Sequence, residues 1–311
     1  MPDSTASNRA PSPRYYIGEW YGYDFVTLSA KNRSRWGATP PVDAICPFKA
    51  GLPGIANKNC SKEGGVCSLR LYAKDTNGNI TPQEKRDTLC PHRFLEDGKI
   101  FGWIGEHVLG DPTALVVPEV PFLNPSLKNS GATSSRAIGK IDHVLVSQKN
   151  GGFEWCAVEI QAVYFSGENM QQDFARHSEF GSGLIWPLIV RRPDYRSSGP
   201  KRLMPQLQTK VPTISRWGKK TAVVIDEAFW NSLSKMNEVD HISNAEVVWF
   251  VVKYSATTTG KITLERHSVH HTTLDGAVVG LTGGTPMPKD RFESELRARL
   301  KPRVTKTNLD Q

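Results

Sequence analysis

The segment 154–165, EWCAVEIQAVYF, constrains the fold most, because it has the composition of a buried β-strand yet carries two polar side chains. Side chains alternate between the two faces of a strand, so Glu159 and Gln161 are neighbours on one face, flanked by apolar residues. Burying a carboxylate is costly unless a cation, a metal or a functional site compensates it. The alternative interpretation is a barrel or edge strand with one face in water.

A second strand is predicted just before it, at 139–147, where GKIDHVLVS is rich in β-branched residues. The linker contains the pair Asn150-Gly151, which favours a tight type I′ hairpin turn. If these two residues form the loop, paired positions sum to 301 and Asp142 lies directly opposite Glu159. Cross-strand neighbours have Cβ atoms about 5 Å apart on the same face. The sequence thus predicts two adjacent carboxylates.

Two carboxylates at this separation repel one another and raise each other's pKa unless a cation lies between them. Oxygen ligands of this kind suit Mg²⁺ or Mn²⁺, which need only one or two protein carboxylates besides water and substrate phosphate oxygens. The hairpin therefore predicts a divalent-metal site at Asp142 and Glu159.

Five cysteines provide an independent signal, and four of them precede the hairpin: Cys46, Cys60, Cys67 and Cys90. Their spacing lacks the C-x₂-C pairs typical of zinc sites, so a four-thiolate metal site, disulfides and unpaired structural thiols all stay open. The N-terminus has no apolar secretion signal, which favours a reducing compartment over disulfides. Cys156 lies among apolar residues of the predicted strand and is interpreted as a core residue.

An Asp followed by Glu-x-Gln on the next arm of a hairpin resembles the catalytic signature of the PD-(D/E)xK nuclease superfamily, in which the last residue is usually Lys. With the cysteines included, the chain resembles the NotI family of restriction endonucleases, which combines that core with an iron ion held by four cysteines. The resemblance spans about residues 14 to 255. Its landmarks are IGEWYG (17–22), CPF (46–48), GVC (65–67), CPHR (90–93), ID (141–142) and VEIQ (158–161).

The resemblance implies an α/β fold with a PD-(D/E)xK core, a mixed sheet flanked by helices, and an N-terminal metal-binding segment with four cysteine ligands. By the same resemblance, Asp142, Glu159 and the Ile160 carbonyl bind a catalytic Mg²⁺, and Gln161 takes the third catalytic position. It also implies that the four cysteines hold a structural iron, for which zinc can substitute. Gln161 can orient water, but it cannot supply the positive charge of a lysine.

Charge agrees with a nucleic-acid partner, since the formal net charge is +8 and the pI is about 9.2. Together with the resemblance, this leads us to expect double-stranded DNA as the partner, a homodimer if the target is palindromic, and a bacterial cytoplasmic location. No apolar run is long enough to predict a membrane span. One basic stretch follows the hairpin and is interpreted either as a phosphate-contacting surface or as a solvated loop. It comprises Arg191, Arg192, Arg196, Lys201, Arg202, Arg216, Lys219 and Lys220.

The predicted organisation has disordered tails at 1–13 and 301–311, an N-terminal region at 14–125 with the cysteine segment at 27–100, and a nuclease core at 126–300. The predicted activity is sequence-specific, Mg²⁺-dependent hydrolysis of DNA, as in a type II restriction endonuclease. The alternatives are a DNA-binding protein with an idle nuclease centre, or a repair or nicking nuclease of lower specificity.

Overall fold

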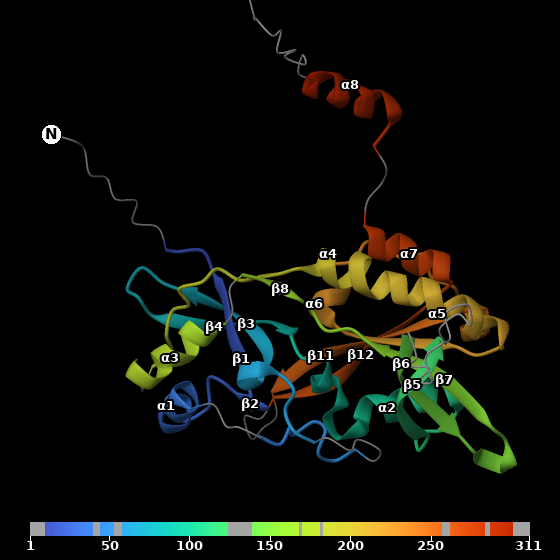
Figure 1. The fold of residues 1–311 in the computed structure, drawn as a ribbon, viewed down its shortest axis with the longest axis horizontal. Coiled ribbons are helices and arrows are strands. Elements are labelled where there is room, and N and C mark those ends of the chain that lie inside the picture. Colours follow the sequence, from blue (N-terminus) through green and yellow to red (C-terminus); the bar gives the residue numbers. More distant parts are fainter. Residues whose placement is uncertain are drawn as a thin grey trace, which may run out of the picture.

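The computed structural model describes residues 10–39, 44–52, 58–123, 139–167, 170–180, 183–256, 262–283 and 287–300. The expected C-terminal tail and most of the N-terminal one lie outside these ranges, as does the predicted domain boundary after residue 125. The described chain is built on two sheets and one short two-stranded ladder (Figure 1).

The larger sheet is mixed and six-stranded, with the order β12-β11-β10-β7-β6-β5. β7, β10 and β11 run parallel to one another, while the other neighbours are antiparallel. Its central strands are apolar on both faces, because helices cover both sides. The strands are β5 (Leu115–Leu123), β6 (Gly139–Ser147), β7 (Glu154–Ile160), β10 (Thr221–Asp226), β11 (Val247–Ala256) and β12 (Ile262–Thr272).

The hairpin of β6 and β7 has the predicted register but a different turn. Pairs from His143–Val158 to Ser147–Glu154 all sum to 301, which confirms the expected alignment. The chain reverses through residues 148–153, which include a 3₁₀ turn at Lys149–Gly151, so the predicted two-residue turn is wrong. The predicted strand 154–165 is also too long, since β7 ends at Ile160.

Helices flank the larger sheet on both faces. On one face, α5 (Met204–Arg216) and α7 (Leu274–Thr282) pack against β10 and β11. On the other, α2 (Lys99–Ile104) packs against β6, β7 and β11. Figure 1 shows the sheet between these two layers. Apolar residues recur along α5 at helical intervals, which buries one stripe of the helix.

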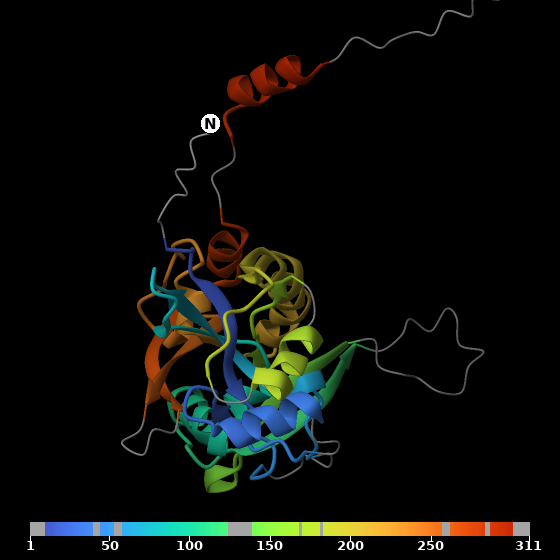
Figure 2. The same ribbon diagram turned by 90° about the vertical axis from the view of Figure 1, so that its left-hand side faces the viewer.

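The smaller sheet is four-stranded, with the order β2-β1-β3-β4, and its aromatic residues form a separate core. Its strands are β1 (Arg14–Trp20), β2 (Tyr23–Asp24), β3 (Val66–Lys74) and β4 (Ile80–Thr88). α1 (Ala30–Ala38) and α3 (Gln171–Phe180) lie side by side next to it in both views (Figures 1 and 2). Trp20 stacks on Phe174 of α3, so a segment that follows the hairpin completes this N-terminal core.

The remaining elements are short or peripheral: β8 (Phe165–Ser166), β9 (Arg192–Pro193), α4 (Tyr195–Ser198), α6 (Glu227–Trp230) and α8 (Lys289–Arg299). Asp226 caps α6, accepting a hydrogen bond from the Phe229 N–H at 2.8 Å. α8 has no buried residue and stands apart from the body in Figures 1 and 2. Across the described ranges, no helix combines the length and apolar character that crossing a membrane requires.

Candidate active site

Asp142 and Glu159 meet where β6 and β7 end. Asp142 is half-buried, and its Oδ2 accepts a hydrogen bond from the Ile160 N–H at 3.0 Å. Glu159 is 1% exposed and lies level with Val223 of the parallel strand β10, on the face that α5 covers. The structure therefore brings the two predicted carboxylates to one end of the hairpin.

Glu159 is electrostatically perturbed. Burial, together with the nearby Asp142 carboxylate, raises its pKa to about 7, and the positive charge of Lys210 and the backbone N–H of Asp142 oppose this rise. Its Oε1 is held by Lys210, whereas its Oε2 is buried without a hydrogen-bond partner. A buried carboxylate oxygen without a partner is costly, and a bound cation would satisfy it.

Gln161 lies just beyond β7, at the start of the loop. Its backbone N–H donates to the Val224 carbonyl at 3.0 Å, which continues the pairing with β10. Its side chain is buried, and Nε2 donates to the carbonyl of Ala162 at 2.5 Å. Gln161 thus follows Glu159 by two residues alongside β10, and its amide is turned toward the backbone.

Lys210 is the residue of this site that the sequence interpretation missed. Its ammonium lies 2.7 Å from Glu159 Oε1 and 3.1 Å from Gln206 Oε1, and the residue is buried. A signal for it exists in the sequence: Leu207, Val211 and Ile214 mark the buried stripe of α5, and position 210 falls on that stripe. A lysine there requires a buried acidic partner.

The four cysteines of the N-terminal region form two backbone-linked pairs. Residues 45 and 59 form an isolated antiparallel bridge, with Cys46 donating to the Lys58 carbonyl and Cys60 to the Ala44 carbonyl. Cys90 N–H donates to the Cys67 carbonyl at 3.0 Å. Cys46 and Cys67 belong to one core cluster, against which Cys60 packs. Ionised Cys46 or Cys60 would raise the pKa of Cys90.

Backbone N–H groups favour the thiolate forms of Cys46 and Cys90, whereas the Sγ atoms of Cys60 and Cys67 donate to the carbonyls of Lys62 and Gly65. The N–H groups of Phe48 and Lys49 lower the pKa of Cys46, and the N–H of His92 lowers that of Cys90. Burial is the larger effect: it raises the pKa of Cys46 and takes that of Cys90 to about 11. Thiolates would therefore need a cation here, and the N–H groups are placed to stabilise them.

Cys156 behaves differently from the other four. It is fully buried on the α2 face of β7, and burial alone raises its pKa to about 12. Its burial confirms the interpretation as a core residue. In the described ranges, however, no three His, Cys, Asp or Glu side chains stand in an arrangement ready to hold a metal ion.

The basic stretch after the hairpin contains both paired and exposed side chains. Arg191 is buried and pairs with Asp173 at 2.7 Å, Lys219 pairs with Glu154, and Lys220 donates to the Ser243 carbonyl at 2.9 Å. These three side chains are therefore engaged by partners within the protein. The other members are exposed: Arg192, Arg196, Lys201, Arg202 and Arg216.

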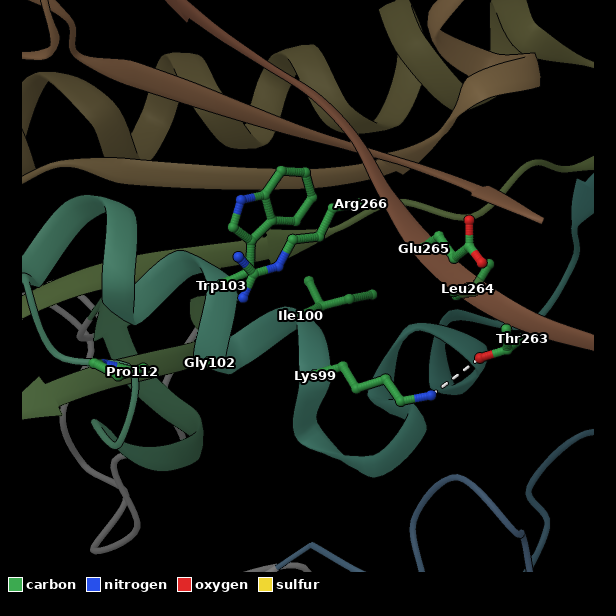
Figure 3. A pocket seen from close by; sticks show the side chains of 9 residues that line it. All are labelled: Lys99, Ile100, Gly102, Trp103, Pro112, Thr263, Leu264, Glu265 and Arg266. Carbon is green, nitrogen blue, oxygen red and sulfur yellow. Dashed lines mark hydrogen bonds between the residues drawn. The ribbon is translucent and has the colours of Figure 1, made fainter. Parts of the chain in front are cut away.

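A shallow pocket lies between α2 and β12, where the Lys99 ammonium donates to Thr263 Oγ1 at 3.0 Å (Figure 3). β12 is at one edge of the larger sheet, whereas β6 and β7 lie toward the other. The pocket is therefore separate from the carboxylates. Its lining residues are Lys99, Ile100, Gly102, Trp103, Pro112, Thr263, Leu264, Glu265 and Arg266.

Comparison with known proteins gives one family. The family described as "Restriction endonuclease NotI" matches residues 37–264, which include the four paired cysteines, the hairpin and α5. No curated protein matches the sequence.

Proposed function

Because the chain belongs to the NotI family of restriction endonucleases, enzymes that cut DNA, we propose that it hydrolyses double-stranded DNA at a specific sequence, using Mg²⁺ at Asp142 and Glu159. The observation that carries this proposal is the buried Glu159 Oε2, which has no partner and lies at the hairpin end shared with Asp142. The mixed sheet with a β6–β7 hairpin and the adjacent parallel β10 supports a PD-(D/E)xK core.

The residues present fit a hard divalent cation. Two carboxylates and a backbone carbonyl are the oxygen ligands that Mg²⁺ accepts, with water and phosphate oxygens completing its shell. Asp142, Glu159 and the Ile160 carbonyl would hold it. When bound, the ion supplies Lewis-acid chemistry to the water and the phosphate.

Other groups of the chain would orient the site, the water and the DNA. Asp142 also accepts from the Ile160 N–H, which fixes the end of β7 relative to β6. Gln161 Nε2 lies within a hydrogen bond of a backbone carbonyl and would orient a water only after turning away from it. The exposed basic residues of 192–202 would contact phosphates and position the duplex.

For the four paired cysteines we propose a structural iron site, with zinc as an alternative occupant. Its support is the chemistry of the donor set: four thiols in two backbone-linked pairs, with backbone N–H groups that lower the pKa of Cys46 and Cys90. Four thiolates accept either ion. A closed thiolate site stabilises its segment and does not take part in hydrolysis.

We also propose that the protein acts on DNA as a homodimer. A duplex has two strands to cut, and each chain offers one Asp142–Glu159 pair, so two copies related by a twofold axis would match a palindromic site.

The proposal is tested by incubating the purified protein with long duplex DNA and Mg²⁺, beside Asp142→Ala and Glu159→Gln variants. Wild-type protein should give discrete fragments, and each variant should lose about 10³-fold in rate, because several kcal/mol of transition-state stabilisation depend on the metal. DNA affinity should persist, since phosphate contacts elsewhere dominate it. Full activity in either variant would refute the assignment. Smeared or nicked DNA would favour a less specific nuclease, and intact, retarded DNA a binding protein.

A further inference from the structure

We propose that Lys210 of α5 is a positioning residue that holds the Glu159 carboxylate in the orientation in which it binds a divalent cation. This inference rests on the proposed function and adds to it a residue from an element distant in the sequence. Lys210 lies 51 positions after Glu159, and the two meet because α5 packs over the face of the sheet that carries Glu159.

The contact is short and shielded from water. The Lys210 ammonium lies 2.7 Å from Glu159 Oε1, and the two side chains are 7% and 2% exposed. An ion pair between charged groups at this depth is geometrically demanding, because both partners lose their hydration. Such a pair restrains the carboxylate far more than an exposed one would.

Lys210 is itself held in place by its helix. Gln206, one turn earlier on α5, accepts a hydrogen bond from the same ammonium at 3.1 Å. Leu207, Val211 and Ile214 are fully buried on the same stripe, so the helix cannot readily shift relative to the sheet. Two of the three ammonium N–H donors are thereby engaged, one of them on Glu159.

Lys210 pairs with only one oxygen of the Glu159 carboxylate. This asymmetry suggests that Lys210 positions the other oxygen for metal binding. Oε1 is bound by Lys210, whereas Oε2 is buried without a partner at the end of β7 where Asp142 lies. Rotation of the carboxylate would break the ion pair, so Oε2 is kept directed away from the ammonium. Groups that orient metal ligands in this way typically contribute about 10–100-fold to metal affinity or activity.

A different role for Lys210 predicts a different effect of its removal on metal binding. If Lys210 only occupies the place of the cation, its removal relieves charge repulsion, and metal binding becomes tighter. The experiment therefore measures Mn²⁺ binding to the protein by electron paramagnetic resonance, beside single-turnover cleavage. The variant is Lys210→Met, which keeps the length of the side chain on an apolar stripe. Lys235→Met is the matched control, because Lys235 is exposed in the loop after α6.

We expect Lys210→Met to weaken Mn²⁺ binding and slow cleavage by about 10–100-fold each, while Lys235→Met changes neither. In a Glu159→Gln background, Lys210→Met should cause no further loss, because it acts through Glu159. Unchanged or tighter Mn²⁺ binding in folded Lys210→Met, or additive losses in the double variant, would overturn the inference. Wild-type protein that neither binds Mn²⁺ nor cuts DNA would instead refute the proposed function.

Should Lys210→Met fail to fold, Lys210→Arg provides the same test. A guanidinium keeps the charge and can donate to Glu159. We then expect Mn²⁺ affinity within a few-fold of wild type. A loss in the folded Arg variant as large as that of Glu159→Gln would overturn the inference.

Discussion

Arg93 shows at the scale of one residue how the cysteine segment is fixed to the rest of the protein. Its guanidinium is fully buried and contacts Glu19 Oε1 at 2.8 Å and Glu96 Oε2 at 2.9 Å. It also donates to the Ile262 carbonyl of β12, and Glu96 accepts from the Leu264 N–H. One side chain thus links β1 of the smaller sheet to β12 of the larger one, three residues after Cys90.

Replacing Arg93 with Leu should destabilise the protein by about 3–5 kcal/mol, because it leaves Glu19 and Glu96 buried without their cation. Urea unfolding at neutral pH measures the free energy of unfolding. Arg297→Leu is the control, since Arg297 is 79% exposed on α8 and should change stability by less than about 0.5 kcal/mol. Equal effects of the two substitutions would contradict this account of Arg93.

At the scale of elements, Cys46 and Cys60 flank the Ile45–Asn59 bridge, whereas Cys67 and Cys90 link the start of β3 to the segment after β4. Metal binding and ordering of these elements should be one coupled equilibrium. Replacing Cys46, Cys60, Cys67 or Cys90 with Ser should therefore remove the bound iron or zinc and much of the stability together.

Cys156→Ser is the internal control for that prediction. It should keep the metal and cost about 1 kcal/mol or somewhat more, because it places a hydroxyl in an apolar site. Elemental analysis and thermal unfolding of all five variants check both expectations. If Cys156→Ser loses the metal while one of the other four keeps it, the site has been assigned to the wrong residues.

The elements also show which parts of the structure are predictable. The β6–β7 register follows from the alternation of apolar residues, because a slip by one position would turn Glu159 to the other face. The turn between them does not follow, since several loops preserve the same register. Lys210 could not be placed from periodicity alone: the stripe of α5 shows that the position is buried, but not which strand it faces.

For the molecule as a whole, the Glu159 carboxylate and the core that contains the cysteines lie on opposite faces of β7. Glu159 faces α5, whereas Val158 and Cys156 face the core that includes Cys46 and Cys67. The cysteine segment therefore shares a hydrophobic core with the face of β7 opposite Glu159. The sequence pattern does not predict β4 of the smaller sheet, because its sequence ITPQEKRDT lacks a strand-like alternation of polar and apolar residues. Pairing with β3 stabilises it instead.

The most direct test of the central claim is to map the ends of DNA cut by the protein. Long duplex DNA of known sequence is incubated with the wild-type protein and Mg²⁺, and the ends of all fragments are sequenced. If the protein is a site-specific nuclease acting through Asp142 and Glu159, every fragment end should carry the same short sequence. Both strands should be cut at a fixed position relative to that sequence. The Glu159→Gln protein should leave the same DNA intact. Ends scattered over unrelated sequences, or identical ends from the Glu159→Gln protein, would contradict the account.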